Sequence, residues 1–465
     1  MGNEFIGRSA ELDRVRRFLD DPKHALGVVY GRRRIGKSRL LTQALRKGGC
    51  PSVFFECRQS SDRDNADKLL AAMEVQLGLP RMAFQRMEEV LEYLFKYAEE
   101  RPLVLVLDEY PHLQKLIAGG DGVIQGLVDQ YEGKSKLKII LCGSHMDIMR
   151  SLVEHAAPLY GRAGLVLHLK ALDYCEASAY FPTFSNEDKV RLYAAFGGSP
   201  GLLRHIDPGK TVRENIIDVF MEPDGVGTTL TDMLLSELSK VEKANLVLSA
   251  LATGPLRFSE LLAKTGMESS PVLDYVLKKL DKMEVVRKEF PINAKNDRRR
   301  TFYSIGDLPM RFHRRFVEPN MGNVNYSGAQ AAYDAAVEEE FETQYVPQVF
   351  EEIVKQFLIR RNRAGKMPVR IDDIGTYFYN LPELRKNGRF DVVTLDKDGC
   401  VCYEVKFRNH PMTQAEVDAE KLQVAKSPLV CTRFGFVTKA GYEGVAPSPD
   451  LTLWPLDDLY DPENF

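Results

Sequence analysis

Apolar runs and helical periodicity divide the first 150 residues into strands and helices. LGVVY (26–30) is a β-branched apolar run, and RLLTQALRK (39–47) places its apolar residues at helical spacing. LVLVL (103–107) and LKIIL (137–141) are almost entirely apolar, which is typical of parallel strands buried on both faces. The pattern predicts an α/β fold with a parallel sheet.

A different pattern begins near residue 233. Two short segments, VVRKEFP (285–291) and RRTFYSI (299–305), alternate like the strands of a hairpin. Three helical segments precede them, at 233–254, 256–266 and 269–286. Three helices followed by a β-ribbon predict a winged helix, a shape used by DNA-binding proteins.

The last third contains an amphipathic segment at 350–362 that predicts a helix. RFDVVTL (389–395) and CVCYEVKF (400–407) are both strand-like. The four residues DKDG (396–399) between them end in glycine, as a tight turn does. A hairpin is therefore predicted after the helix.

The register of this hairpin decides which side chains meet. If Leu395 pairs with Cys400, then Asp391 lies opposite Glu404, and Lys406 shares their face. Two facing carboxylates repel each other, and a divalent metal ion would remove that penalty. A slip of one residue would move Asp391 to the other face, so the inference depends on the turn.

Composition narrows the classes of function. The 465 residues include 44% hydrophobic and 28% charged ones, with a net charge of −3, so the chain is an ordinary globular one and any nucleic-acid surface must be local. The first residues lack a signal-peptide pattern, and no apolar run is long enough to span a membrane. Seven scattered cysteines favour reduced thiols in the cytoplasm.

The turn after the first strand carries a phosphate-binding pattern. Gly31-x4-Gly36-Lys37-Ser38 matches the P-loop in full, between a predicted strand and helix. Backbone N–H groups of such a loop and the start of the helix bind phosphate oxygens. Lys37 would neutralise the β- and γ-phosphates, and Ser38 would offer its hydroxyl to Mg²⁺. The predicted nucleotide contacts of this stretch are Gly31, Arg34, Ile35, Gly36, Lys37, Ser38 and Arg39.

Polar side chains follow the next two strands. Asp108 and Glu109 end the second buried strand, where open α/β sheets bind ligands. Asp108 would hold Mg²⁺ through water, and Glu109 would polarise the attacking water. Ser144, after the third strand, would contact the γ-phosphate or align that water. Arg162 could reach a phosphate of a neighbouring subunit as an arginine finger, or be a surface arginine.

FIGRSAEL, GRRRIGKS, VLDEYPHL, ILCGSHMDIM, PLYGR and GGSPGLL occur in this order. Together they resemble the AAA+/STAND-type P-loop ATPases that are abundant in archaea and also found in bacteria. The resemblance implies that Ile6, Gly7 and Arg8 lie near the adenine, that ALDYCEASAYF to GGSPGLLRHI forms a small helical lid, and that Pro200 lies by the base. ATP and Mg²⁺ are the implied cofactors, although no residue distinguishes ATP from GTP.

Basic residues concentrate around the predicted wing. Positions 287 to 315 hold nine basic and three acidic side chains, and Arg298, Arg299 and Arg300 lie near the wing tip. Such a patch would meet DNA phosphates. Winged helices also pack or link domains, and Asp274 and Asp281 in the recognition helix (269–286) weaken the case for base reading.

Asp391 and Glu404-x-Lys406, after a helix bearing Glu351, resemble the PD-(D/E)XK nuclease core. The resemblance implies Mg²⁺ held by Asp391 and Glu404, with Lys406 aiding the attacking water at a phosphodiester. Gln414 would fit the polar position that some such nucleases carry. E-x-K is also common in solvated strands, so the motif alone leaves an inactive scaffold open.

The sequence thus predicts a P-loop ATPase domain with a helical lid (1–230), a winged helix (231–320) and a small restriction-endonuclease-like α/β domain (321–465). The expected function is ATP binding and hydrolysis coupled to DNA binding and, in one version, Mg²⁺-dependent cleavage of nucleic acid. The alternative is an ATP-switched regulatory module that binds DNA or protein and carries an inactive nuclease-like domain. A homo-oligomer is compatible with a finger role for Arg162.

Overall fold

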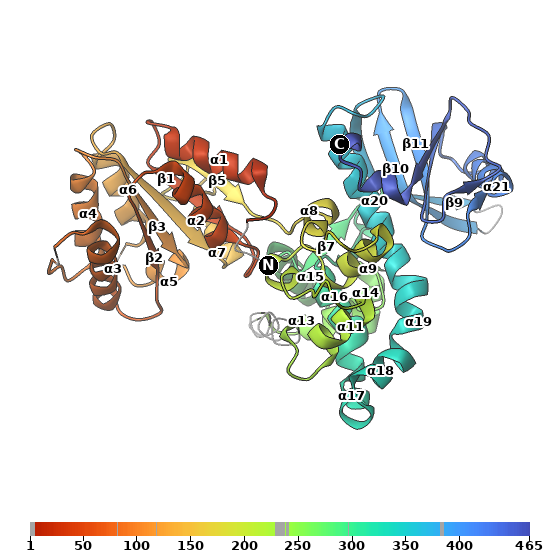
Figure 1. Ribbon diagram of the computed structural model, residues 1–465, viewed down its shortest axis with the longest axis horizontal. Coiled ribbons are helices and arrows are strands. Elements are labelled where there is room, and N and C mark those ends of the chain that lie inside the picture. Colours follow the sequence, from red (N-terminus) through yellow and green to blue (C-terminus); the bar gives the residue numbers. More distant parts are fainter. Residues whose placement is uncertain are drawn as a thin grey trace. The chain divides into compact units, whose positions relative to one another are not determined.

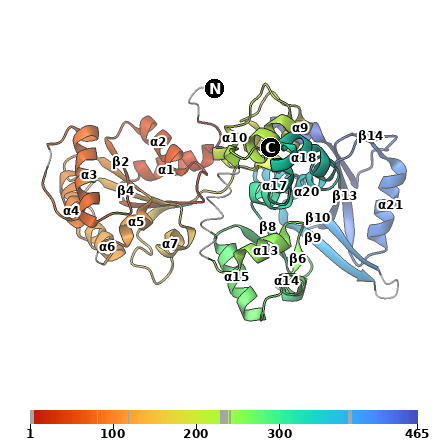
Figure 2. The ribbon, with the colours of Figure 1, turned by 90° about the horizontal axis from the view of Figure 1, so that it is seen from below.

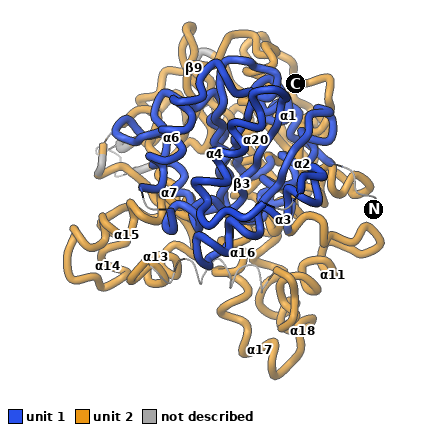
Figure 3. The backbone as a smooth tube through the Cα atoms, turned by 90° about the vertical axis from the view of Figure 1, so that its left-hand side faces the viewer, with its two compact units in different colours: residues 1–172, 199–201 blue, residues 173–198, 202–465 orange. Residues whose placement is uncertain are grey.

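The computed structural model of the chain describes residues 5–80, 82–117, 119–227, 238, 241–295, 297–381 and 386–465. These residues belong to two compact units (Figures 1 and 3). Unit 1 consists of Met1–Leu172 and Ser199–Gly201, and unit 2 of Asp173–Gly198 and Leu202–Phe465. The predicted domain boundary at 230 lies outside the described residues, and the three predicted domains remain a prediction.

Unit 1 is built on a five-stranded parallel sheet in the order β2-β3-β4-β1-β5. Every residue of β1, β3 and β4 is buried, which confirms the prediction of strands covered on both faces. Its elements are α1 (Ser9–Asp20), β1 (Leu26–Tyr30), α2 (Lys37–Gly48), β2 (Ser52–Glu56), α3 (Asp62–Leu77), α4 (Met87–Tyr97), β3 (Leu103–Asp108), α5 (Tyr110–Gln114), α6 (Asp121–Gln130), β4 (Leu137–Gly143), α7 (Met146–Ser151) and β5 (Ala163–His168).

Successive residues of β1 and β3 face two separate hydrophobic cores, one on each side of the sheet. Val29 and Val106 pack with apolar residues of α1 and α2, whereas Val28 and Leu105 pack with those of α3, α4 and α6. This division follows from the period of two along a strand. Because all five strands are parallel, the residues after β1, β3 and β4 lie along one edge of the sheet.

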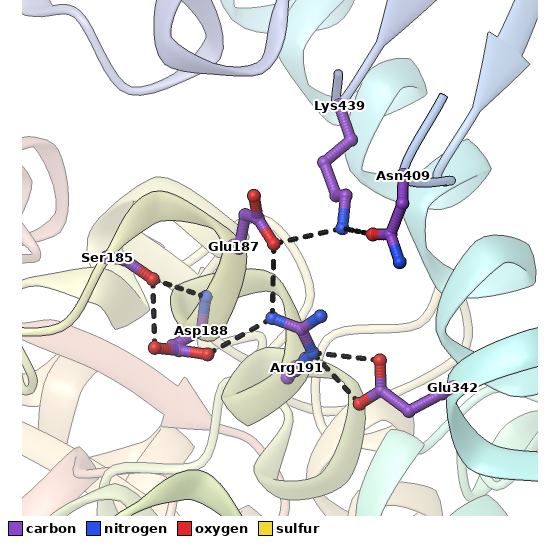
Figure 4. A network of polar contacts seen from close by, with 7 residues as sticks. All are labelled: Ser185, Glu187, Asp188, Arg191, Glu342, Asn409 and Lys439. Carbon is purple, nitrogen blue, oxygen red and sulfur yellow. Dashed lines mark hydrogen bonds and ion pairs between the residues drawn. The ribbon is translucent and has the colours of Figure 1, made fainter. Parts of the chain in front are cut away.

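Unit 2 begins with a group of helices, of which those before residue 206 lie in the segment that the sequence assigns to a lid. They are α8 (Tyr174–Ser178), α9 (Asn186–Phe196), α10 (Pro200–Leu203), whose first two residues belong to unit 1, and α11 (Val212–Ile216), followed by a π-helical turn (Ile217–Met221). Arg191 of α9 lies at the centre of a polar network (Figure 4). It pairs with Glu342 (2.9 Å) and with Glu187, which in turn pairs with Lys439 (3.0 Å). The helices 173–198 are therefore attached to the C-terminal part of the chain.

Residues 241–305 of the predicted winged-helix region, apart from residue 296, contain three α-helices and a three-stranded antiparallel sheet in the order β6-β8-β7. The predicted hairpin is confirmed, with Val286 opposite Ile305. Positions 233–237 of the first predicted helix lie outside the described residues. The elements are α13 (Ala244–Leu251), β6 (Leu256–Arg257), α14 (Phe258–Thr265), α15 (Ser270–Lys282), β7 (Val286–Glu289) and β8 (Phe302–Ile305).

The chain then runs through α16 (Leu308–Phe312), α17 (Met321–Ser327), α18 (Ala329–Ala336) and α19 (Glu338–Glu340) to the long helix α20 (Val346–Arg363). A mixed sheet follows in the order β15-β13-β11-β10-β9, and α20 packs on three of its strands (Figure 2). The remaining elements are β9 (Ile371–Leu381), β10 (Lys386–Asp396), β11 (Gly399–Lys406), β12 (Met412–Thr413), α21 (Gln414–Ala425), β13 (Cys431–Thr438), β14 (Tyr442–Glu443) and β15 (Leu451–Pro455).

The loop between β7 and β8, where the sequence predicts a wing, lies against the outer strand β9 of the mixed sheet. Ile292 N–H donates to the Thr376 carbonyl (2.7 Å), and the Asn293 side chain donates to the Phe378 carbonyl (2.7 Å). Phe302 stacks on Phe378, with ring centroids 4.8 Å apart. Unpaired backbone groups of an edge strand invite further pairing, and this loop satisfies two of them.

Glu352 of α20 joins the β6-β8-β7 module to the mixed-sheet module. Its carboxylate accepts hydrogen bonds from Arg287 of β7 (2.9 Å) and Arg311 of α16 (2.7 Å). Burial acts to raise the pKa of Glu352, but the two guanidinium groups outweigh it and hold that pKa below its usual range. When one partner of a buried ion pair is removed, the other partner remains as a buried charge without a counter-charge.

We expect Glu352→Gln to lower the free energy of unfolding of unit 2 by about 3 kcal/mol at pH 7, because the buried Arg311 guanidinium group loses its carboxylate partner and Arg287 keeps only Glu289. The stabilisation from ionised Glu352 is present above the pKa of the unfolded chain, about 4.3, and is lost as the pH falls further. Urea unfolding can be followed by the fluorescence of Trp454, since the chain has one tryptophan. Exposed Glu339→Gln is the matched control, and equal midpoints for the two variants would contradict the expectation.

Candidate functional site

The P-loop joins β1 to α2 as predicted. Gly36, the residue before α2, has φ 96°, a left-handed conformation that favours glycine. The Lys37 side chain is buried and its Nζ donates to the carbonyls of Gly31 (2.9 Å) and Arg32 (3.0 Å). The lysine is thus held across the loop, with its ammonium group beside the backbone that would surround a phosphate.

Ser38 and Asp108 meet at the carboxyl edge of the sheet. The Ser38 hydroxyl donates to Asp108 Oδ2 at 2.6 Å, although the two residues are seventy positions apart. A hydroxyl and a carboxylate are oxygen ligands of the kind that Mg²⁺ prefers, directly or through water. The two residues that were predicted to hold the metal ion are therefore brought into contact, and their donor set fits Mg²⁺.

Glu109 and Ser144 form a second contact at this edge. The Ser144 hydroxyl lies 2.9 Å from each carboxylate oxygen of Glu109, and the Ser144 N–H points at the same group (3.4 Å). Glu109 has φ 49° and ψ 41°, a left-handed conformation that is uncommon for a residue with a side chain. Such strain occurs where surrounding structure positions a functional group. Here it directs the Glu109 carboxylate toward the end of β4.

The Arg8 side chain contacts the backbone of the phosphate loop. Its guanidinium group donates to the carbonyls of Ile35 (3.2 Å) and Lys170 (2.6 Å), and the side chain is buried. Arg8 and Gly7 both have left-handed backbone angles, φ 64° and φ 72°. Arg8 therefore contacts the backbone of the P-loop, whereas the position of Ile6, Gly7 and Arg8 near the adenine stays a prediction.

Pro200 is also brought to the P-loop. Gly201 N–H donates to the Arg34 carbonyl (3.1 Å), and a Cβ on Gly201 would lie 2.6 Å from the Cβ of Arg34, so glycine is required there. A Cβ on Gly36 would lie 3.9 Å from Pro200 Cγ. Ser199, Pro200 and Gly201 thus touch or approach the P-loop. The segments before and after them in the chain belong to unit 2.

The other predicted loop residues differ in exposure. Ile35 is buried in the core shared by α1 and α2, whereas Arg34 and Arg39 are exposed at the loop and the first turn of α2. Arg162 precedes β5 and lies at the amino edge of the sheet, since Ala163 pairs with Leu26 at the start of β1. Its guanidinium group bonds Asp129 at 2.7 and 2.9 Å.

The predicted register of the C-terminal hairpin is confirmed. Leu395 pairs with Cys400, and the ladder continues to Val392 opposite Tyr403. Asp391 and Glu404 follow at the end of this ladder. Asp391 forms an ion pair with Arg389, and Glu404 forms one with Lys406.

Two further carboxyl groups lie near this pair, and their pKa values are raised. Burial and the charge of Asp391 raise the pKa of Glu351, on α20, to about 8. Burial and the charge of Glu404 raise the pKa of Glu420, on α21, to about 7. Burial is the larger cause of both shifts, and repulsion from the neighbouring carboxylates adds to it. The sequence pointed to Glu351 and gave no signal for Glu420. Gln414, which would fit a polar position of some such nucleases, donates its side-chain amide to Asp418.

These groups are not arranged as a preformed metal cage. Within the described ranges, no three His, Cys, Asp or Glu side chains are placed to hold a metal ion together. The donor chemistry suits a divalent cation, but Asp391 and Glu404 would have to leave Arg389 and Lys406.

None of the helices in the described ranges has the length and hydropathy of a membrane span.

Comparisons with known proteins agree with the geometry of unit 1. Residues 5–206 match a family described as an ATPase domain predominantly from Archaea, and residues 313–421 match one described as archaeal and bacterial proteins of unknown function. An uncharacterized protein of Methanocaldococcus jannaschii is 24% identical over 388 residues, 82% of this chain and 83% of that protein.

A solved structure shares the fold. A Walker-type ATPase of Pyrococcus abyssi gives a TM-score of 0.52 at 20% identity, over 67% of this chain and 96% of its own. The ORC2 protein of Aeropyrum pernix, in ADPNP and ADP complexes, gives 0.48 at 15% identity, over 70% of this chain and 96% of its own. Residues 5–206 thus combine the phosphate loop and the acidic strand end with similarity to ATPase domains found predominantly in Archaea.

Proposed function

We propose that unit 1 binds ATP with Mg²⁺ and hydrolyses it. The observation that carries this proposal is the convergence of Ser38, Asp108, Glu109 and Ser144 at one edge of the sheet, beside the P-loop. Lys37 and the loop N–H groups bind the phosphates, and Ser38 and Asp108 hold Mg²⁺. The metal ion, when bound, neutralises charge on the phosphate oxygens.

Glu109 acts on the attacking water in this proposal. A carboxylate that accepts a proton from water must be within hydrogen-bond reach of it, and Ser144 keeps Glu109 at the strand end. When the water takes a position between them, Ser144 can donate to the water or to the γ-phosphate instead. Ile6, Gly7, Arg8 and Pro200 would border the base, and Arg162 would act only across a subunit boundary, after leaving Asp129.

Lys37→Ala tests the nucleotide site. We expect calorimetry with ATP and Mg²⁺ to show an affinity at least about tenfold weaker, because a charge-assisted contact to the phosphates is lost. Exposed Lys115→Ala is the control for a change of charge alone. Equal heats of binding for parent and Lys37→Ala would remove the basis of the proposal.

The C-terminal module is proposed to cleave nucleic acid with Mg²⁺. The observation that favours this is the pair of raised pKa values, for Glu351 and Glu420, around Asp391 and Glu404. A cation at this place would remove the repulsion that raises them. Asp391 and Glu404 would hold the ion, and Lys406, freed from Glu404, would assist the attacking water.

A second candidate function is an ATP-switched regulator that binds DNA or protein without cutting. The docking of Ile292, Asn293 and Phe302 on β9 favours it, because a wing engaged in packing links modules. Arg300 near the wing tip pairs with Asp297 (3.5 Å). This function predicts DNA affinity with a steep salt dependence and no product, whereas cleavage predicts product with Mg²⁺ or Mn²⁺.

Coupling between ATP and the C-terminal module would run through residues 173–203. The P-loop contacts Ser199–Gly201, and the adjacent helix α9 carries Arg191 and Glu187, which pair with Glu342 and Lys439 (Figure 4). Asp173 adds an ion pair with Arg360 of α20 (2.6 Å). A nucleotide that displaces Pro200 would act on a segment already tied to the mixed sheet.

A further inference from the structure

A pocket of about 80 Å³ lies within unit 2, apart from the P-loop. It opens where α13 ends and where β8, α20, β9 and β10 approach one another. Leu251 and Pro255 form an apolar wall, and Ser304 and Thr376 contribute polar side chains. Pockets between modules of one chain are common places for ligands.

The charged side chains of this pocket have a positive surplus. Its lining includes five cationic and three acidic residues. The acidic ones are Glu289, Glu351 and Glu352. The cationic ones are Arg287, Arg311, Arg315, Lys355 and Arg389.

Most of these cations are held in place by ion pairs. Arg287 and Arg311 share Glu352, and Arg315 bonds Glu340 at 2.6 Å. Arg287 also donates to the Ser304 hydroxyl, and Arg311 donates twice to the Ile305 carbonyl. Each of these two guanidinium groups therefore uses three of its five N–H donors on protein acceptors and keeps two for another acceptor.

Lys355 differs from the arginines. It lies on α20 one turn beyond Glu351, on the face that also presents Gln348 to the pocket. In the part of the chain that the structure describes, Lys355 pairs with no carboxylate. Its charge acts on Glu351, one turn earlier, without an ion pair at contact distance, so this half-buried side chain can offer its three donors to an anionic ligand.

The size of the pocket selects among anions. A buried water needs roughly 10–15 Å³ by a comparable measure, so about 80 Å³ holds several waters or one tetrahedral oxyanion. A nucleoside is too large to enter. Guanidinium and ammonium groups are the usual donors to phosphate oxygens, in bidentate and single contacts respectively.

We propose that this pocket binds one phosphate group, with Lys355 and Arg389 as its main donors and Arg287, Arg311 and Arg315 as the positive surround. The phosphate is either a free ion or a backbone phosphate of a nucleic-acid strand whose sugars and bases stay outside. The proposal requires neither ATP hydrolysis nor a metal ion at Asp391.

The test uses the full chain carrying Lys37→Ala, in EDTA, so that neither the P-loop nor a metal contributes. Inorganic phosphate is titrated calorimetrically into this protein with and without Lys355→Gln. We expect Lys355→Gln to weaken phosphate binding by about tenfold or more, since a charged hydrogen-bond donor is lost. Lys47→Gln, at the exposed end of α2, is the matched control and should leave the affinity unchanged. Trp454 fluorescence verifies that each variant is folded.

A short single-stranded DNA, added as competitor, distinguishes the two sources. If the DNA competes with inorganic phosphate, and this competition disappears in Lys355→Gln, the pocket binds a backbone phosphate. If the DNA does not compete with inorganic phosphate, the pocket binds the free ion. Phosphate binding that is absent from the Lys37→Ala protein, or unaffected by Lys355→Gln in a folded protein, overturns the proposal. Neither outcome bears on ATP hydrolysis, which is measured with the parent protein.

Discussion

Glu109→Gln should lower the kcat of ATP hydrolysis by about 10²–10⁴-fold and leave the affinity for ATP nearly unchanged. The size of the effect is that of a general base, because glutamine cannot take a proton from the attacking water. Binding should persist, since Lys37 and the loop N–H groups do not contact Glu109. The Ser144 hydroxyl can still donate to the amide oxygen of glutamine, so the strand end should keep its geometry. Steady-state phosphate release gives kcat, and calorimetry gives the affinity.

Exposed Glu74→Gln, on α3, is the control for loss of one carboxylate and should hydrolyse at the parental rate. Ser144→Ala separates positioning from proton transfer. It should lower kcat less than Glu109→Gln does, because the carboxylate remains. A Glu109→Gln enzyme with parental kcat would assign the base elsewhere, and weakened ATP binding in that variant would mean that Glu109 acts on the nucleotide rather than on water.

Asp391→Asn should abolish Mg²⁺-dependent cleavage of nucleic acid, with a loss of about 10²-fold or more. An amide oxygen is a neutral ligand, so the site would lose charge that both holds the cation and stabilises the transition state. Arg389, which pairs with Asp391, also lies 3.6 Å from Glu351 and would retain a carboxylate partner. The change therefore removes a ligand without leaving Arg389 isolated.

Labelled duplex and single-stranded DNA and RNA, incubated with Mg²⁺ or Mn²⁺, provide the measurement. Exposed Asp372→Asn, on β9 of the same sheet, should cut as the parent does. Cutting that survives in Lys37→Ala but vanishes in Asp391→Asn separates the two centres. If the parent leaves every substrate intact, the cleavage hypothesis is rejected and the regulatory function stands.

Local signals in the sequence were enough for the phosphate loop and for part of the C-terminal hairpin. The P-loop could be predicted because loop residues and helix start are neighbours in the chain, and Asp108 and Glu109 because a parallel strand delivers its end to a known edge. The hairpin register followed from one turn and is confirmed from Leu395 to Val392, whereas the metal site at Asp391 and Glu404 stays a prediction.

Contacts between distant segments could not be predicted. Glu420 approaches Glu404 only because α21 folds back on the mixed sheet, and no spacing in the sequence encodes that return. The same holds for Arg8, whose contact with Ile35 joins two segments through a buried guanidinium group. The docking of the 290–302 loop on β9 likewise depends on where α16 to α20 carry the chain.

The membership of Ser199–Gly201 in unit 1 affects how the protein can be divided. A fragment ending at residue 172 would fold without the proline that borders Gly36. A fragment ending at 206 would keep that proline, but Arg191 would lose Glu342 and Glu187 would lose Lys439. No single cleavage point therefore yields an intact ATPase, and a gene fusion that exchanged the C-terminal half would have to preserve the partners of α9 as well.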